Sequence, residues 1–240
     1  MDLPEADEVH LWRIDLAVAA DNLAALGQTL SPDEVARAKR LRSPLARARF
    51  VAARGMLRAI LARYGDVAPA ALRFRYGPAG KPQIDEFLGT GIGFNLAHSH
   101  DLALLAVARE TRVGVDVELV GDADHSVIAR NFFAPAEQRD LDALPPAQRR
   151  AAFYHCWVCK EAFIKARGAG LALSQFAVSV APDTPAELRF IDDDPDEAGR
   201  WRICAMSPAL GFVAALCVEA RAGDPLRISY RPWEPSRSTT

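Results

Sequence analysis

Cysteine is scarce in this sequence: the 240 residues include four, Cys156, Cys159, Cys204 and Cys217. Only the first two are close together, and they lie inside an apolar run that is predicted to be helical. A redox C-x-x-C motif normally opens a helix, and a structural zinc site needs four ligands. The spacing therefore favours packing for these cysteines, while metal or redox chemistry stays open as an alternative.

Long apolar runs and a strong net charge are also missing. The longest clean apolar run, residues 102–108, is far too short to span a bilayer. The first residues, Met1 to Glu5, are acidic and no apolar stretch follows, so we expect no secretory signal. The formal net charge of −2 suggests neither nucleic acid nor a membrane as a partner. We expect a soluble, cytoplasmic, monomeric protein with one large domain or two small ones.

Two carboxylates stand out at the end of a predicted strand, Gly114-Val115-Asp116-Val117-Glu118. Because side chains alternate between the faces of a strand, Asp116 and Glu118 point the same way. Two acids on one face of an apolar strand repel each other and resist burial, so a cation should lie between them. Mg²⁺ takes carboxylate oxygens and often substrate phosphates. An edge strand with two solvated acids is the alternative.

A long helix is predicted from Pro145 to about Arg167, and it carries Glu161 and Lys165 on one face, four residues apart. Aromatic and aliphatic residues flank this pair, which places it at the edge of a buried surface. Together with Asp116 and Glu118 it would make a group of three carboxylates and one lysine. Such a group suits phosphate chemistry, because acids can hold a metal ion and the lysine can neutralise a leaving phosphate.

Basic residues are concentrated between Val35 and Gly65, a stretch that contains no acidic residue. A solvated helix face usually mixes charges of both signs, so the stretch suggests a platform for an anion, either a phosphate or an acidic protein. A merely basic surface is the alternative. The residues concerned are Arg37, Lys39, Arg40, Arg42, Arg47, Arg49, Arg54, Arg58 and Arg63.

A weak internal repeat relates residues 99–107 to residues 207–215, and each segment follows a long predicted helix at a distance. We therefore predict an α+β fold of two similar α/β subdomains with antiparallel sheets, related by a pseudo-twofold axis. The active site would lie in the cleft between them, as ligand sites often do. The predicted division is residues 1–119, residues 120–232 and a flexible tail, residues 233–240.

Four motifs occur in the order Gly80-Lys81-Pro82, Asn95-Leu96-Ala97-His98-Ser99, Gly114 to Glu118, and Trp157-x-x-Lys160-Glu161-Ala162-x-x-Lys165-x-x-Gly168-x-Gly170. Together they resemble the phosphopantetheinyl transferases of the two-domain, Sfp type, and the chain length agrees. The motifs cover roughly residues 31–170. The resemblance implies an Mg²⁺-dependent enzyme that moves the 4′-phosphopantetheine arm of coenzyme A to a serine of an apo acyl or peptidyl carrier protein. The other product would be 3′,5′-ADP.

The resemblance also implies roles for the reactive residues. Asp116, Glu118 and Glu161 would bind Mg²⁺ against the coenzyme A pyrophosphate, which makes Asp116 catalytic through the metal. Glu161 would also be the general base for the carrier serine. Lys165 would contact the phosphate and assist the leaving group.

Coenzyme A contacts are implied at four further positions. Asn95 and His98 belong to the signature that holds the phosphates, Lys81 to the signature beside the nucleotide, and Arg37 to a basic contact. Two departures from the family concern these contacts: Ala97 replaces the usual serine, and Glu34 stands where some members have a basic residue.

The resemblance also bears on carrier docking and on which other functions remain open. Either Phe132 or Phe133 would be exposed, since the family meets its carrier near this region. A different coenzyme A enzyme, such as an acyltransferase, would not need the metal carboxylates. A non-catalytic module that binds coenzyme A or a carrier remains the alternative function. Which carrier is served, whether from fatty-acid, polyketide or peptide synthesis, stays open.

Overall fold

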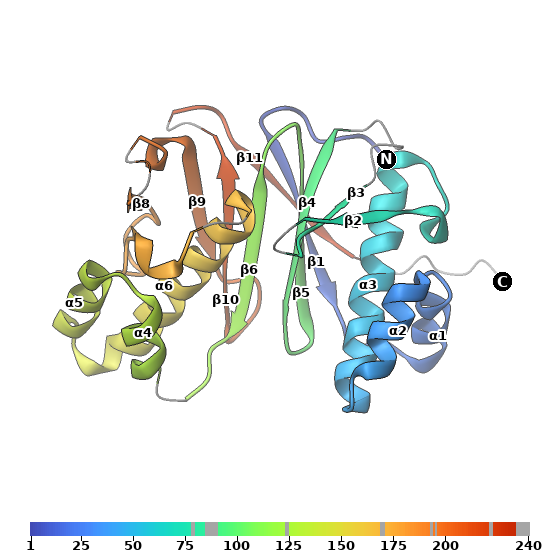
Figure 1. Ribbon diagram of the computed structural model, residues 1–240, viewed down its shortest axis with the longest axis horizontal. Helices are drawn as coiled ribbons and strands as arrows, with labels where there is room; N and C mark the ends of the chain where they lie inside the picture. The colour runs from blue at the N-terminus through green and yellow to red at the C-terminus, as the bar shows by residue number, and fades with distance from the viewer. Residues whose placement is uncertain are drawn as a thin grey trace.

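Two β-sheets lie side by side at the centre of the protein, with long helices on their outer faces (Figure 1). The computed structural model describes residues 1–77, 80–84, 91–122, 125–168, 171–192, 194, 196–220 and 223–233. Residues 234–240 of the predicted tail, Gly170 of the fourth motif and part of the turn before Lys81 lie outside these ranges. Of the helices in the described ranges, none is both long and apolar enough to cross a membrane.

The first sheet has the strand order β11-β1-β5-β4. Its central pairs, β1 with β5 and β5 with β4, are antiparallel, whereas β11 runs parallel to β1. The helix α3 packs on its outer face, and a small hairpin of β2 and β3 lies beside it. The elements are β1 (Glu8–Asp15), α1 (Ala20–Gly27), α2 (Pro32–Arg40), α3 (Pro44–Gly65), β2 (Phe74–Tyr76), β3 (Pro82–Ile84), β4 (Ile92–Ser99), β5 (Leu102–Arg109) and β11 (Arg227–Pro232).

The second sheet has the strand order β6-β10-β9 and is antiparallel throughout. Helix α6 covers its outer face, and the hairpin of β7 and β8 lies nearby. The elements are β6 (Val113–Leu119), α4 (Ser126–Phe132), α5 (Pro135–Ala143), α6 (Pro146–Arg167), β7 (Phe176–Val178), β8 (Leu188–Ile191), β9 (Trp201–Met206) and β10 (Phe212–Glu219). The predicted α+β class with mainly antiparallel sheets is confirmed.

Three apolar layers hold these elements together. One fills the space between the two sheets, a second lies between the first sheet and α3, and a third lies between the second sheet and α6. Strand β5 faces two of these layers, so residues 102–108 are buried on both sides. This explains why that strand is a continuous apolar run in the sequence rather than an alternating one.

Strand pairing does not follow the predicted boundary between residues 119 and 120. Strand β6 precedes that boundary but pairs with β10 of the second sheet, and β11 returns from the end of the chain to pair with β1. Along the chain, the second sheet therefore begins with β6, before the predicted boundary. Alternation along a strand shows which side chains share a face, but the partner strand is chosen by packing between distant segments.

Local signals in the sequence account for the helix starts. The backbone N–H of Ser31 donates to Glu34 Oε2 at 2.9 Å as part of a capping box at the start of α2. Ser43 Oγ accepts a hydrogen bond from the Ala46 N–H at 3.3 Å at the start of α3, where Pro44 occupies the first helical position. Helix α1 was not predicted from the sequence. None of its residues is fully buried, so it lacks the apolar stripe that marks a core-facing helix.

All four cysteines are free thiols, and Cys156 and Cys159 are fully buried in the layer beneath α6. Burial raises the pKa of Cys159, which keeps the thiol protonated. Packing is therefore the role of this pair, as the spacing favoured.

Candidate active site

Gly114 allows α6 to lie directly against β6. A Cβ atom at this position would overlap the backbone of Ala162 and Ala166 on α6. Because Asp116 is two residues further along the same face of the strand, its carboxylate also faces α6. The absence of a side chain at Gly114 thus brings the strand acids within reach of the helix residues Glu161 and Lys165.

Asp116 and Lys165 form an ion pair across this contact. Lys165 Nζ donates to Asp116 Oδ1 at 2.5 Å. The Asp116 side chain is buried, and its other oxygen, Oδ2, has no hydrogen-bond partner among the described residues. Burial raises the pKa of Asp116 to about 6, Lys165 opposes this shift, and the negative charges of Glu118 and Glu161 add to it.

Glu161 lies near the same lysine, and Glu118 lies close enough to Asp116 to act on its charge. Glu161 Oε2 is 3.9 Å from Lys165 Nζ, and both side chains are partly exposed. Glu118 Oε2 accepts a hydrogen bond from Ser99 Oγ at 2.9 Å. The structure therefore brings together Asp116, Glu118, Glu161 and Lys165, which the sequence predicted from two motifs more than forty residues apart.

A divalent cation suits these donors in kind. All three are carboxylates, the oxygen ligands that Mg²⁺ prefers, and Asp116 Oδ2 is a buried oxygen without a partner. Over the described ranges, however, no three His, Cys, Asp or Glu side chains are gathered closely enough to hold a metal ion. Lys165 lies on the Asp116 carboxylate and supplies the positive charge there.

Asn95 and Ser99 of β4 join the edge of the first sheet to β6. Asn95 Oδ1 accepts a hydrogen bond from the Val115 N–H at 2.8 Å, and Ser99 Oγ accepts one from the Leu119 N–H at 3.1 Å. Asn95 is buried, so its side-chain carbonyl serves the fold. Ser99 binds both the backbone of β6 and the Glu118 carboxylate. From the sequence it was identified only as the last residue of the Asn95–Ser99 motif, with no role of its own. Because Ser99 is two residues from Ala97 and four from Asn95, strand alternation places it on the same face as Asn95, and this spacing could have identified it.

His98 and Ala97 point to opposite faces of β4. The His98 ring is exposed, and partial enclosure together with Lys165 lowers its pKa, whereas Glu118 acts in the opposite direction. His98 is therefore within electrostatic reach of the carboxylate group. Ala97, which replaces a serine of the related family, is buried in the apolar layer between the sheets.

Lys81 bonds to two backbone carbonyls, and its expected place beside a nucleotide stays a prediction. Its Nζ donates to the Val113 carbonyl at 2.9 Å and to the Lys165 carbonyl at 2.5 Å. Burial lowers the pKa of Lys81 to about 8, and Arg112 adds to this effect. The ammonium group thus ties the start of β6 to the end of α6. A cavity of about 250 Å³ adjoins it, lined by Gly80, Lys81, Pro82, Asn95, Ile164, Lys165 and Gly168.

Part of the basic stretch is neutralised by acids from outside it. Glu34 is buried and accepts from Arg54 Nε and Arg58 Nε, each at 2.6 Å. Arg49 Nε donates to Asp101 Oδ1 at 2.7 Å. Two arginine partners explain how an acid can be buried at position 34.

Arg37 remains exposed, and its guanidinium lies over the Phe50 ring at 5.6 Å from the centroid. Lys39, Arg40 and Arg42 are exposed near it, so a basic surface persists over α2 and the turn that follows.

Phe132 and Phe133 have opposite environments. Phe133 is buried, whereas Phe132 is 44% exposed and packs edge-on against Trp157 of α6 with a centroid separation of 6.1 Å. One exposed phenylalanine was expected here, and its contribution to carrier docking stays a prediction.

Comparison with known proteins places this arrangement in context. A family model described as the 4′-phosphopantetheinyl transferase superfamily matches residues 112–217, which run from β6 to β10. The 4′-phosphopantetheinyl transferase HetI of Nostoc sp. is 41% identical over 216 residues, covering 89% of this chain and 88% of that protein. The putative 4′-phosphopantetheinyl transferase slr0495 of Synechocystis sp. is 37% identical, covering 72% of this chain and 70% of that protein. The 4′-phosphopantetheinyl transferase Sfp of Bacillus subtilis is 27% identical, with coverages of 64% and 71%.

Proposed function

Because this chain belongs to the 4′-phosphopantetheinyl transferase superfamily, and so is an enzyme that transfers phosphopantetheine to a carrier protein, we propose that Asp116, Glu118, Glu161 and Lys165 form its reaction centre. The donor would be coenzyme A, the acceptor a serine hydroxyl of an apo acyl or peptidyl carrier protein, and the second product 3′,5′-ADP. The observation that carries this proposal is the ion pair of buried Asp116 with Lys165, beside the partly exposed Glu161.

The division of labour follows from burial and charge. Glu161 is partly exposed and can accept the serine proton. Lys165 can offset the charge that grows on the departing nucleotide, since it already lies beside two carboxylates, Asp116 and Glu161. Asp116 has a pKa of about 6 and is therefore mostly ionised at neutral pH, and the adjacent Lys165 favours this charged form.

Mg²⁺ would be held by Asp116, Glu118 and Glu161, and when bound it would draw charge from the phosphate under attack. The unpartnered Asp116 Oδ2 supports its inclusion among the ligands.

Coenzyme A would bind beside this centre. The cavity lined by Gly80, Asn95 and Lys165 adjoins the lysine that would contact the phosphate. His98 and the exposed Arg37 would add positive charge or hydrogen bonds for the remaining phosphates. Lys81 would act mainly through the backbone it holds, rather than through the nucleotide.

The reaction centre would lie between two related halves of the chain. The sheet order β1-β5-β4 of the first half matches β6-β10-β9 of the second, with the first strand antiparallel to the central strand in each. In both halves two shorter helices and one long helix follow the first strand. A small hairpin then precedes the last two strands of the half. We therefore place the halves at residues 8–109 and 113–219, related by a pseudo-twofold axis, with β11 added to the first sheet. The cleft would follow the contact between β4 and β6.

The remaining expectations concern partner and location. An exposed Phe132 and the basic surface around Arg37 would suit an acidic carrier protein. Four free thiols are typical of a reducing compartment, which supports the expected cytoplasmic location. A monomer would suffice, because all the proposed reacting residues come from one chain.

Mass spectrometry of an apo-carrier incubated with coenzyme A, Mg²⁺ and this protein tests the proposal. We expect a gain of one phosphopantetheine group, and its loss when EDTA replaces Mg²⁺. In single-turnover reactions at saturating coenzyme A, Glu161→Gln should slow transfer by roughly two to four orders of magnitude, the range for loss of a general base. Glu5→Gln, at an exposed glutamate far from the site in sequence, serves as the control. Unchanged transfer by Glu161→Gln would place the base elsewhere, and coenzyme A binding without any mass gain would favour a non-catalytic binding module.

A further inference from the structure

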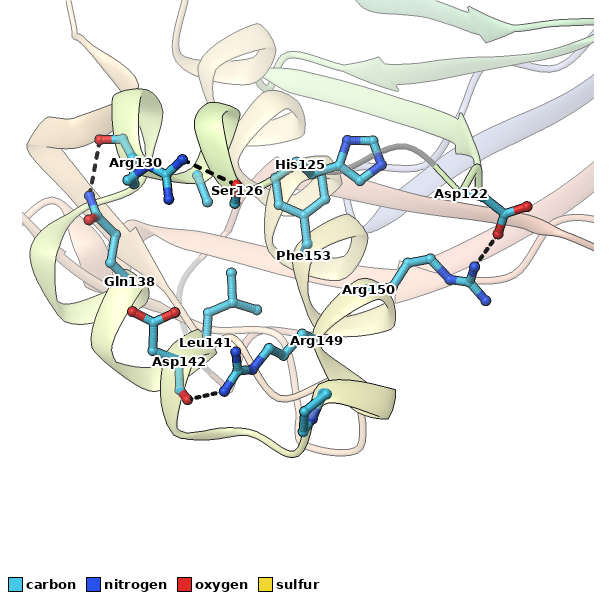
Figure 2. Close-up of a pocket in the computed structure, with 12 residues that line it drawn as sticks. Asp122, His125, Ser126, Arg130, Gln138, Leu141, Asp142, Arg149, Arg150 and Phe153 are labelled. Carbon is cyan, nitrogen blue, oxygen red and sulfur yellow. Dashed lines mark hydrogen bonds and ion pairs between the residues drawn. The ribbon is translucent and has the colours of Figure 1, made fainter.

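A second cavity lies between α4, α5 and the first turns of α6, away from the reaction centre (Figure 2). Its volume of about 490 Å³ is within the range of small-molecule sites in proteins. Phe153 on its wall and Lys165 of the reaction centre are twelve residues apart on α6, or about 18 Å along a helix. The cavity therefore cannot be part of the centre described above.

The charged wall of this cavity consists of three arginines and two aspartates, Asp122 and Asp142. Arg149 is oriented by two backbone carbonyls: its Nε donates to Leu144 O at 2.9 Å and its Nη2 to Asp142 O at 2.7 Å. Arg130 Nη2 donates to Ser126 Oγ at 3.2 Å. Within the described residues neither Arg130 nor Arg149 forms an ion pair with a carboxylate, whereas Arg150 pairs with Asp122. Two oriented guanidinium groups thus keep hydrogen-bonding capacity for an anion.

An aromatic surface lies beside these cations. The His125 ring lies against the Phe153 ring (Figure 2). The two rings stack with a centroid separation of 4.5 Å and an interplanar angle of 6°. His125 Nε2 is a buried nitrogen without a hydrogen-bond partner in the described part of the chain. Because almost none of its surface is accessible, a molecule in the cavity cannot reach this nitrogen, and His125 contributes to the wall through other atoms of its side chain.

We propose that this cavity, hereafter the α4–α6 cavity, binds a small organic anion that joins a phosphate or carboxylate to one aromatic ring. The anionic group would bind between Arg130 and Arg149. The ring would lie along the apolar wall of Phe153 and Leu141. This site goes beyond the proposed transfer reaction and does not depend on it.

Phenyl phosphate is a suitable probe, used with the full chain and saturating coenzyme A so that the reaction centre is already filled. Calorimetry should give saturable binding with a dissociation constant of about 1 mM or tighter, and NMR should show the largest shifts in the ring signals of His125 and Phe153. Arg130→Gln should weaken binding roughly tenfold, as expected for loss of one charge-assisted hydrogen bond. Arg139→Gln, an exposed arginine on α5 that does not line the cavity, is the matched control and should leave binding unchanged.

Three outcomes would overturn the proposal. The first is an absence of saturable binding below about 10 mM. The second is equal affinity of wild type and Arg130→Gln. The third is a shift pattern centred on residues other than those of the α4–α6 cavity. Inorganic phosphate as a separate probe should bind more weakly than phenyl phosphate, and equal affinity for both would remove the aromatic wall from the site.

Discussion

Asp116→Asn is expected to stabilise the protein at neutral pH while abolishing its activity. The wild-type carboxylate is buried, has one unpartnered oxygen and lies close to two other acids, so its ionised form is unfavourable in the folded chain. Asparagine has nearly the same shape and carries no charge. Loss of the proposed metal ligand should stop transfer, whereas loss of the buried charge should favour folding.

The size of the effect follows from the pKa. The folded chain has a pKa of about 6 for Asp116, against an ordinary value of 3.8. The folded chain therefore holds the proton more tightly than the unfolded chain, so this contribution to stability is present at low pH. It is lost as the pH rises from about 4 to about 6, and the total is about 3 kcal/mol. This figure already includes the attraction of Lys165, which opposes the upward shift of the Asp116 pKa.

Urea unfolding in EDTA, at several pH values between about 4.5 and 7, measures this effect. The free energy of unfolding of the wild type should fall relative to Asp116→Asn by about 2 kcal/mol over this interval. Asp21→Asn, at an exposed aspartate in the first turn of α1, is the control and should follow the wild type. Added Mg²⁺ should stabilise the wild type and not Asp116→Asn. Parallel pH profiles for wild type and Asp116→Asn would refute the reasoning.

Three further substitutions test how the centre is held. Lys81→Met should reduce turnover and lower the free energy of unfolding by roughly 1–3 kcal/mol, since two carbonyls lose their donor; a rise confined to the Michaelis constant for coenzyme A would instead indicate nucleotide contact. Gly114→Ala should cost at least about 3 kcal/mol in urea unfolding and abolish transfer, because the new methyl group meets backbone on α6; unaltered stability would contradict the close approach. Lys160 and Glu137 form a fully buried ion pair beneath α6. Lys160→Met should lower the free energy of unfolding by roughly 3–5 kcal/mol, because Glu137 is left buried without its partner. Combining it with Glu137→Gln should restore much of this loss, as thermal unfolding would show.

Local features of the fold were predictable because their physics is local. The capping box of Ser31 and Glu34, prolines at the first helical position and the alternation from Val113 to Glu118 depend only on neighbouring residues. Such local signals give the helix from Pro145 to about Arg167 and the strand that ends at Glu118. The four ordered motifs indicated the family, and the comparisons confirmed it.

Contacts between distant segments were decided by the tertiary structure alone. Nothing near Glu34 in the sequence indicates that Arg54 and Arg58 will surround it, and nothing near Lys160 indicates Glu137. Such buried pairs form where packing removes water from both partners at once. The basic stretch therefore carried less uncompensated charge than its composition suggested.

The candidate site shows the same division. Residue type and spacing determined which carboxylates share a face and which lysine can meet them, because strand and helix periods follow from backbone geometry. The tertiary structure decided that β6 joins the second sheet, that Asn95 and Ser99 hold its edge, and that Lys81 binds two backbone carbonyls. Pairing of a strand and enclosure of an amine depend on which apolar faces meet across the whole chain, and no local pattern encodes that choice.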